Sequence, residues 1–371
     1  MALRTQTGST QTPSPSPPKT RKRPLMHKPW TPLSVVWETT LHCNMHCMHC
    51  GSSAGTKRTN ELSTQEGLHL CNDLADMGTR LVALMGGEPF LREDWDTLAR
   101  HIKDRGMEVT ILSNGYLIDD ALVRKLRPLE PYAVTISIDG GTHETHDAIR
   151  GTTESFQHCL DSLEYLTNAG IPTTVVTTVQ HSNLRELPLL RDRLLGRGIA
   201  WQIQMAVPMG RFPRSEMLSP EEFYSVALFI ASLKKTFSQQ ELPVMGAHNF
   251  GYCSQVLPNI MLFPWLGCQA GLSSLGVHSD GTVSGCMSLP AAFTEGNIRS
   301  RPLKELWQDP TAFSYNRGEF KDAVSGSCVG CRKSKRCRGG CLTVSYALTG
   351  AYHGDPYCLR RLEQQLHLNE K

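Results

Sequence analysis

The chain has 371 residues, a formal net charge of +3 and 13 cysteines. Its length suits one large domain plus a smaller one, and its mixed charges indicate no nucleic-acid partner. The cysteines are too sparse for a small secreted disulfide scaffold, and their short spacings favour metal binding. No apolar run is long enough to cross a membrane, and the N-terminus lacks a signal peptide's apolar core. We therefore expect a cytoplasmic protein in a reducing compartment, with no membrane partner.

Residues 1–30 are rich in Ser, Thr and Pro and carry a run of basic side chains. Such a segment cannot bury enough apolar surface to fold, so we expect a disordered basic tail. Residues 31–235 then alternate short β-rich runs with amphipathic helices, and we expect them to form the main domain. Residues 236–265 are expected to be an irregular bridge, and residues 266–371 a second, cysteine-rich domain.

Six βα repeats are expected in the main domain, which implies a parallel sheet with helices outside. The expected strands are 34–39, 81–85, 108–113, 133–138, 173–179 and 201–206. The first expected helix is capped by Ser63 and ends at Gly78, and helices at 92–105 and 119–126 follow it. A fourth runs from Ser155 to Gly170, a fifth carries Leu187, Leu190 and Leu194, and a sixth runs from Ser219 to residue 235. This pattern leaves open a TIM-like barrel or a doubly wound sheet. Both place functional loops at the carboxyl ends of the strands.

The first cysteine motif follows the first expected strand. Cys43, Cys47 and Cys50 have the spacing C-x3-C-x2-C. Three thiolates hold a [4Fe–4S] cluster and leave one iron open to another ligand. Structural zinc usually takes four protein ligands, which His46 or His49 could complete, so the motif alone leaves both metals open.

Each further motif also follows a strand: Gly86-Gly87-Glu88-Pro89, Asn114-Gly115 and Asp139-Gly140. The cysteine motif and the Gly-Gly-Glu-Pro stretch together resemble the radical SAM (S-adenosyl-L-methionine, AdoMet) enzymes. The resemblance implies an α/β fold with a partial (β/α)6 TIM-like barrel, open on one side. It implies a [4Fe–4S] cluster on Cys43, Cys47 and Cys50, whose open iron binds AdoMet, and a 5′-deoxyadenosyl radical made from it. It also implies that AdoMet lies against Gly86, Gly87, Glu88 and Pro89, with Glu88 shaping the loop.

Other side chains enter through the same resemblance. Ser137 and Asp139 occupy positions where related enzymes contact the AdoMet ribose, and Arg150 matches an arginine near the AdoMet carboxylate. Such an arginine can bind a carboxylate with two hydrogen bonds. His49 falls at a position near the adenine. Asp139 is also compatible with an ordinary Asp-Gly turn.

Four residues are given structural or neutral interpretations. Cys71 and Cys159 lie on expected helix faces and are predicted to be buried small hydrophobic residues. His143 and His146 follow the fourth strand and could face the site, although we expect exposed loop histidines.

The second cysteine group matches the pattern of the SPASM domain found in one branch of these enzymes. The matched residues are Cys268, Gly281, Cys286, Cys328, Cys331, Cys337, Cys341 and Cys358. The resemblance implies two auxiliary [4Fe–4S] clusters. One is held by Cys328, Cys331, Cys337 and Cys358, and the other by Cys268, Cys286 and Cys341, with Cys253 as a candidate fourth ligand. Zinc remains the alternative metal.

The resemblance implies an oxidative enzyme that removes hydrogen from a ribosomal precursor peptide and forms a crosslink or thioether. An electron donor such as flavodoxin or ferredoxin would reduce it. No acid–base triad is expected, and no catalytic side chain is assigned. Many such enzymes carry a leader-binding domain, which the residues before Leu33 are too few to form. The alternatives are a small-molecule substrate in haem or quinone-cofactor biosynthesis and a non-enzymatic iron–sulfur scaffold. Sulfatase maturation fits less well, because Met287 replaces the aspartate expected after Cys286.

Overall fold

The computed structural model describes residues 30–248, 250, 254, 256–257, 260–262, 264–318 and 324–366. The expected N-terminal tail, apart from its last residue, lies outside them. The strands are β1 Ser34–Thr40, β2 Leu81–Gly86, β3 Glu108–Ser113, β4 Ala133–Ser137, β5 Thr173–Val179, β6 Ala200–Met205, β7 Val244–Gly246, β8 Ser274–Val277, β9 Thr282–Ser284 and β10 Thr294–Asn297. None of the described helices combines the length and the apolar composition needed to span a membrane.

The helices surround these strands. They are α1 Thr64–Asp76, α2 Trp95–Asp104, α3 Asp120–Leu126, α4 His143–Arg150, α5 Ser155–Asn168, α6 Leu187–Leu194, α7 Pro220–Thr236, α8 Leu303–Gln308, α9 Ser314–Arg317, α10 Ser334–Cys337, α11 Leu342–Thr349 and α12 Leu359–Gln365. The cap predicted for α1 is confirmed: Ser63 and Glu66 exchange the two hydrogen bonds of a capping box. The same box, between Ser219 and Glu222, begins α7.

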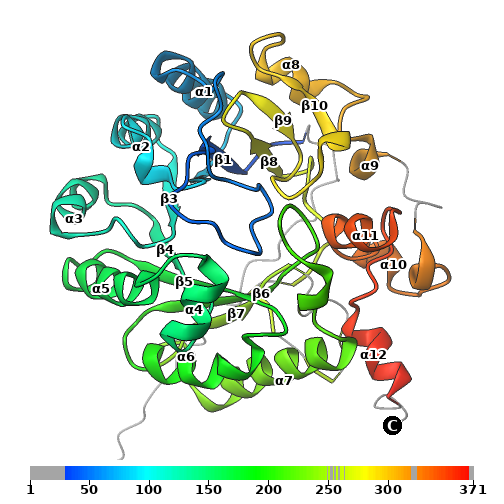
Figure 1. Cartoon of the computed structure of the whole chain (residues 1–371). Coiled ribbons are helices and arrows are strands. Elements are labelled where there is room, and N and C mark those ends of the chain that lie inside the picture. Colours follow the sequence, from blue (N-terminus) through cyan, green and yellow to red (C-terminus); the bar gives the residue numbers. More distant parts are fainter. Residues whose placement is uncertain are drawn as a thin grey trace, which may run out of the picture.

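Strands β1 to β6 lie side by side in sequence order and pair in parallel. A doubly wound sheet would reverse its strand order at a switch point, and this one does not. Helices α1, α2, α3, α5 and α6 lie around the outside of the curved sheet (Figure 1). The predicted partial barrel is therefore confirmed.

Alternation along the strands separates the two faces of the sheet. On β4, Val134 and Ile136 are fully buried in the core that the helices cover, whereas Thr135 and Ser137 are partly exposed to the barrel interior. The core is continuous, from Trp37 on β1 to residues as distant as Leu359 on α12.

Two elements differ from the sequence-based expectation. Helix α4 was expected to be loop, because His143–Arg150 has few apolar residues and therefore no helical periodicity. Its ends nevertheless carry ordinary signals: Thr142 caps the first turn and Gly151 adopts the left-handed conformation after the last. Strand β7 lies inside the expected irregular bridge and pairs in parallel with β6.

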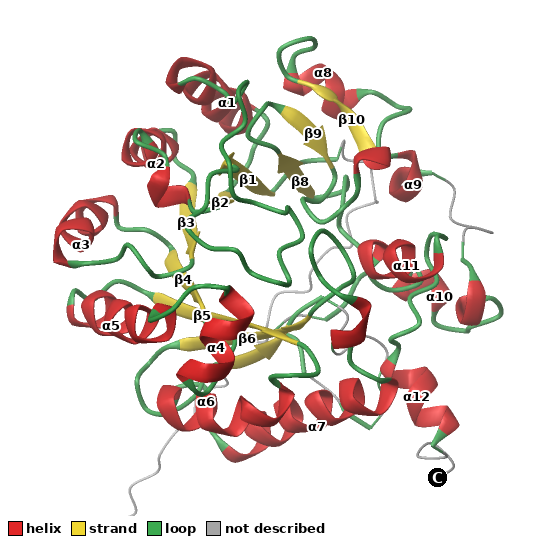
Figure 2. Ribbon diagram, viewed as in Figure 1, coloured by secondary structure: helices red, strands yellow, loops and turns green. Residues whose placement is uncertain are grey.

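The cysteine-rich part of the chain continues the barrel sheet. Strand β8 pairs in parallel with β1, with Ser274 opposite Ser34, and β9 and β10 follow in antiparallel pairing. The ribbon in Figure 2 shows the long loops after the strands gathered inside the ring of helices, next to this extension. The two parts of the protein therefore share one backbone hydrogen-bond network.

A buried carboxylate strengthens this junction. Glu38 on β1 is 1% exposed, and its Oε1 accepts hydrogen bonds from Arg58 Nη2 at 2.9 Å and from the Ser279 amide at 3.1 Å. Burial disfavours its charge, but hydrogen bonds from His278, Arg58 and Ser279 outweigh this and lower its pKa to about 2. Glu38 thus joins the first strand, the loop carrying the first cysteines and the hairpin β8–β9.

We predict that Glu38→Gln lowers the free energy of unfolding at pH 7 by about 2–4 kcal/mol, the range for breaking a buried charge network. Because the pKa is lowered on folding, this contribution is complete above about pH 4.5 and disappears as the pH falls toward 2. Urea denaturation of proteins with matched iron content measures both. The control is Glu66→Gln, which breaks an exposed pair with Arg299 across the same junction and should cost under about 1 kcal/mol. Equal losses would contradict the prediction.

Candidate functional site

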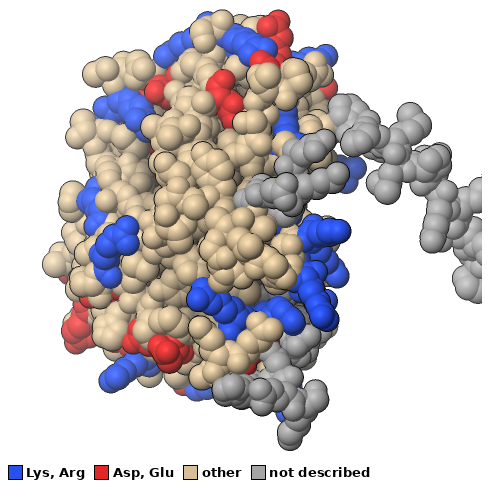
Figure 3. Space-filling view, turned by 90° about the vertical axis from the view of Figure 1, so that its right-hand side faces the viewer, with Lys and Arg blue, Asp and Glu red and all other residues tan. Residues whose placement is uncertain are grey.

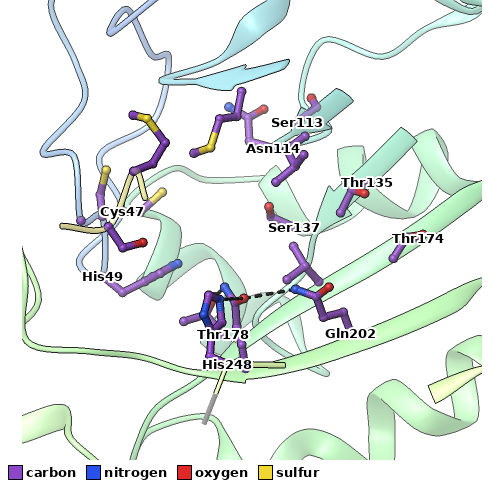
Figure 4. A pocket seen from close by; sticks show the side chains of 18 of the residues that line it. Cys47, His49, Ser113, Asn114, Thr135, Ser137, Thr174, Thr178, Gln202 and His248 are labelled. Carbon is purple, nitrogen blue, oxygen red and sulfur yellow. Dashed lines mark hydrogen bonds between the residues drawn. The ribbon is translucent and has the colours of Figure 1, made fainter. Parts of the chain in front are cut away.

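A cavity of about 840 Å³ lies inside the barrel, and its wall includes residues at the carboxyl ends of the strands. Its wall contains all three cysteines of the first motif and the glycine pair Gly86 and Gly87. It also contains Cys341 from the second cysteine group. Figure 4 shows Cys47 and His49 on one side of this cavity and strand residues on the other. The fold therefore brings motifs separated by some 300 residues to one cavity.

The loop carrying the first cysteines is held by backbone and arginine hydrogen bonds. The amide of Cys43 donates to the Gly55 carbonyl at 3.0 Å. Arg211, which follows β6, donates to the carbonyls of Cys47 at 3.0 Å and Ala54 at 2.7 Å. No motif in the sequence marks Arg211, so sequence analysis missed it.

The three thiols suit an iron–sulfur cluster better than free cysteine chemistry. Burial raises the pKa of Cys43 to about 11 and also raises that of Cys47. Thiolates are therefore unfavourable there unless bound to a metal, which deprotonates a coordinating thiol. Among the described residues, no three His, Cys, Asp or Glu side chains converge on a single ion. In a cluster each cysteine binds a different iron, so such convergence is not required.

Asp139 is the centre of a fully buried polar group beside these cysteines. Its Oδ2 lies 2.5 Å from Arg150 Nη2 and 3.2 Å from His49 Nε2, and its Oδ1 accepts a 2.7 Å hydrogen bond from the Thr178 amide. Burial favours the neutral acid, yet Arg150 and His49 hold the pKa of Asp139 below its ordinary value. Arg150 Nη1 also lies 3.8 Å from Cys47 Sγ. Asp139 is thus more than a turn residue.

Two nitrogens of this group are buried without a hydrogen-bond partner among the described residues: Arg150 Nε and His49 Nδ1. Burial lowers the pKa of His49 to about 4, so a neutral imidazole lies 3.2 Å from the Asp139 carboxylate. One edge of the Arg150 guanidinium is occupied by Asp139. The predicted contact between Arg150 and the AdoMet carboxylate would have to use the guanidinium nitrogens that do not face Asp139.

The glycine pair is required by the protein's own backbone. A Cβ on Gly86 would lie 2.2 Å from the Thr40 carbonyl oxygen, and one on Gly87 would lie 2.1 Å from that of His42. The Gly87 amide donates to Thr40 at 2.8 Å, and Pro89 is buried at the start of a short 3-10 turn. These glycines therefore allow the end of β2 to pack closely against the cysteine loop, whether or not AdoMet is bound. Their predicted contact with AdoMet remains a prediction.

Glu88 ties the same motif to the next strand. Fully buried, it accepts hydrogen bonds from Ser113 Oγ at 2.9 Å and the Asn114 amide at 2.8 Å. Burial raises its pKa to about 7. The Asn114 side chain in turn donates to Asn44 in the cysteine loop at 2.7 Å. Glu88 therefore shapes the loop through its neighbours.

Polar side chains line the cavity on three adjacent strands. TIM-barrel interiors are usually filled by Val, Ile and Leu, but here the inward positions are largely hydroxyl and amide residues. They are Thr135, Ser137, Thr174, Thr178, Gln202 and Gln204. We call them the polar ladder. Sequence analysis identified only Ser137, because short strands of mixed composition do not reveal which side chains face inward.

The ladder is partly locked by its own hydrogen bonds. Gln204 donates to Thr178 Oγ1 at 3.1 Å and accepts from Gln202 Nε2 at 3.2 Å, and His248 Nε2 lies 3.0 Å from the same Gln204 oxygen (Figure 4). Gln202 donates to Gln204 through Nε2, and its Oε1 has no hydrogen-bond partner among the described residues. The hydroxyls of Thr135, Ser137 and Thr174 likewise have no hydrogen-bond partner among the described residues.

The second cysteine group forms a compact set. Burial raises the pKa of Cys341 well above its ordinary value, and Cys268 and Cys286 add to the effect because their sulfurs lie close. Cys268 and Cys286 also pack against the same small apolar cluster around Phe293. This placement agrees with the ligand set that the sequence resemblance implies. Cys253, the candidate fourth ligand, lies outside the described residues.

The remaining cysteines lie farther along the chain. Burial is the main cause that raises the pKa of Cys328, and the nearby Cys331 raises it further. Arg361 lowers it, so the start of α12 lies near this thiol. Cys358 caps α12, and Cys337 is buried at the end of α10. Their grouping into one four-ligand cluster stays a prediction.

Comparison with known proteins identifies the family. Residues 37–193 match the radical SAM superfamily, and residues 268–337 match SPASM, an iron–sulfur cluster-binding domain. An AdoMet-dependent heme synthase of Methanosarcina barkeri (strain Fusaro / DSM 804) is 32% identical over 343 residues, 89% of this chain and 97% of that protein. The chain belongs to the radical SAM superfamily and carries a SPASM domain. As a radical SAM enzyme it uses AdoMet and iron–sulfur clusters.

Other relatives of this radical SAM/SPASM enzyme have different names. Mycofactocin maturase MftC of Mycolicibacterium smegmatis (strain ATCC 700084 / mc(2)155) is 29% identical over 335 residues, 88% of this chain and 83% of the maturase. The structure of Streptococcus suis SuiB bound to precursor peptide SuiA has a TM-score of 0.73, covering 88% of this chain and 76% of SuiB. At 18% identity, that likeness shows the fold alone.

His143 and His146, which were both expected to be exposed, differ in their burial. His143 is exposed, but His146 is fully buried on α4 and accepts a hydrogen bond from the Asp139 amide at 3.2 Å. Burial lowers the pKa of His146 to about 3, so the ring is neutral. Cys71 and Cys159 are fully buried, as predicted, and Cys159 also donates to the Asn114 carbonyl at 3.1 Å.

We predict that Gly87→Ala displaces the cysteine loop, because its Cβ would meet a backbone carbonyl that cannot rotate away. AdoMet affinity should fall by about 5- to 150-fold, as a steric penalty of about 1–3 kcal/mol implies, with loss of iron from the first cluster. The matched control is Gly55→Ala in the same loop, where a Cβ has nothing within 4 Å. Equilibrium dialysis with AdoMet and iron analysis measure both, and equal effects of the two substitutions would contradict the prediction.

Proposed function

We propose that this enzyme oxidatively modifies a ribosomally made peptide, forming a crosslink or a thioether. The observation that carries the proposal is the polar ladder, which faces the predicted AdoMet site across one cavity that also reaches Cys341. Apart from Ser137, which is predicted to contact AdoMet, the ladder offers two hydroxyls and one amide oxygen without protein partners among the described residues. Such neutral donors and acceptors match the amide groups of a peptide.

The roles of the chain's own residues follow from their positions. Cys43, Cys47 and Cys50 would hold the cluster, with Gly86, Gly87, Glu88, Pro89, Ser137 and Arg150 around AdoMet. When bound, the cluster and AdoMet supply a 5′-deoxyadenosyl radical that removes a hydrogen atom from the substrate. The buried Asp139 group keeps Arg150 oriented beside Cys47. The ladder would fix the peptide so that one C–H bond is presented, which is the protein's contribution to such chemistry.

A second candidate is modification of a haem precursor, favoured by the 32% identity to a heme synthase over 97% of its length. Porphyrin side chains carry carboxylates, which need cations or several donors when buried. Apart from histidines, the cations in the described cavity wall are Arg150 and Arg211. The first is paired with Asp139 and the second is bonded to loop carbonyls. The cavity chemistry therefore favours the peptide.

The proposal extends to the partner and compartment. Reductive use of AdoMet needs a one-electron donor, and we propose a flavodoxin or ferredoxin. Iron–sulfur ligation by ten or more reduced thiols suits a reducing compartment, and we place the enzyme in the cytoplasm.

The substrate is tested by anaerobic incubation of reconstituted, dithionite-reduced enzyme with AdoMet and two substrates in parallel. One is the peptide encoded nearest to its gene, and the other is an iron porphyrin with propionate side chains. We expect loss of two hydrogen atoms from the peptide and an unchanged porphyrin, measured by mass spectrometry. Modification of the porphyrin alone would replace the proposed function by the second candidate.

Alanine at Cys43, Cys47 and Cys50 together should abolish formation of 5′-deoxyadenosine, because no protein ligand of the first cluster remains. The control is Cys71→Ala, which removes a buried thiol away from the cavity wall and should leave cleavage intact in folded protein. Liquid chromatography of the quenched reaction measures the nucleoside. Undiminished cleavage in the triple variant would refute the assignment.

Gln202→Leu should slow peptide modification by about 10- to 100-fold while AdoMet binding stays within twofold, since a free acceptor toward the substrate is lost and nothing near the thiols changes. The control is Gln157→Leu on the exposed face of α5. Rates come from mass spectrometry and AdoMet affinity from dialysis. Equal rates for the two variants would exclude a role of Gln202 in substrate binding.

A further inference from the structure

The second domain carries a cluster of cations that the cavity chemistry does not use. Figure 3 shows Lys and Arg side chains gathered on the side of the molecule that carries α10 and α12. Among the described residues of this region, the exposed cations are Arg332, Lys333, Lys335, Arg336 and Arg361. We call these five residues the basic face.

Among the described residues, the part of the chain that carries the basic face has no exposed acidic side chain. Between residues 324 and 366 the acidic residues are Asp355 and Glu363, which are 1% and 0% exposed. None of the five cations forms an ion pair with another described residue. The net charge of +3 over the whole sequence therefore does not reveal this local excess of positive charge.

The basic face is next to predicted cluster ligands in the chain. Its first four residues stand between Cys331 and Cys337, and Arg361 lies in the first turn of α12, three residues after Cys358. Between Cys328 and Cys331, Val329 is 67% exposed. An exposed apolar residue close to several cations in the chain suits a small, transient interface.

The basic face is separate from the substrate cavity. The second domain contributes Met287, Ser288, Cys341, Thr343 and Val344 to the described cavity wall, but no residue of the basic face. A substrate that reaches the cavity therefore need not touch it. A partner that docks there would instead meet the cysteines farthest from the predicted AdoMet site in sequence.

We propose that the basic face docks an acidic one-electron carrier protein of the flavodoxin or ferredoxin type. Complementary charge accelerates encounter and orients the partner, and electron-transfer interfaces are small and short-lived. One electron leaves the reduced carrier and enters an iron–sulfur centre of this protein, and no bond or proton is exchanged. The inference rests on the proposed function only in requiring an electron donor, and it is independent of the substrate.

The test uses purified acidic flavodoxin and the cluster-loaded full chain, under argon. Isothermal titration should give micromolar binding that weakens at least about tenfold between 50 and 300 mM NaCl, as screening requires. Lys335→Glu with Arg336→Glu should weaken binding at 50 mM NaCl by about 10- to 100-fold and slow oxidation of reduced flavodoxin similarly. Arg361→Glu, on a different helix, should act in the same direction.

The matched control is Arg124→Glu with Lys125→Glu. These are also two adjacent exposed cations in the last turn of a short helix, but on α3, on the opposite side of the molecule (Figure 1). This control should bind flavodoxin within about twofold of the wild type, since charges beyond the Debye length are screened. AdoMet cleavage driven by dithionite should be unchanged in the basic-face variants of equal iron content.

Three outcomes would overturn the proposal. They are unchanged flavodoxin binding in both basic-face variants, equal weakening in the α3 control, or a glutamate-rich peptide that binds the basic face as tightly as flavodoxin. The last result would assign the face to an acidic peptide. Failure of the proposed peptide chemistry would appear separately, as absent product with dithionite while flavodoxin binding stays intact.

Discussion

A fully buried carboxylate, Asp139, fixes the geometry around the predicted AdoMet site. Its partners belong to three different elements: Arg150 to α4, His49 to the cysteine loop and the Thr178 amide to β5. An uncompensated buried charge is far more costly than a paired one, so each partner is held where Asp139 requires it. Since Arg150 also contacts Cys47, the position of the second cysteine depends on the end of β4. One charge at a strand end thus positions a loop from ninety residues earlier.

The second constraint is steric and acts through Gly86 and Gly87. The cysteine loop passes so close to β2 that a side chain at either position would meet a carbonyl oxygen. Glu88 continues the connection to β3, and Asn114 returns it to the loop at Asn44. The family motif is therefore explained by packing within the protein before any ligand is considered. A contact with AdoMet would use a backbone that these glycines have already shaped.

Much of this could be predicted from the sequence, and the exceptions have physical causes. Strand positions follow from apolar runs, and the cysteine spacings identify metal sites because ligands must be close in space. Helix α4 was missed because its buried side chains are His146 and Arg150 beside a single isoleucine, so apolar periodicity is absent. His146 was misjudged as exposed for the same reason. Arg211 and the polar ladder depend on which residues face the barrel interior, and that is decided by strand register rather than by composition.

Sequence identity to relatives shows the family, whereas the charge of the cavity wall bears on the choice of substrate. An identity of 32% to a heme synthase over 97% of its length is enough to show the family. In the function that we propose, substrate choice depends on a few residues of the cavity wall, such as Gln202 and Thr174, which contribute little to an overall identity. Those side chains are neutral, and the arginines nearby are already paired. Burying several carboxylates in such a cavity would leave them without counter-charges, whereas a peptide brings amides that the ladder can satisfy. The interior of this barrel is therefore better suited to a neutral chain than to an anionic ring, whatever the relatives act on.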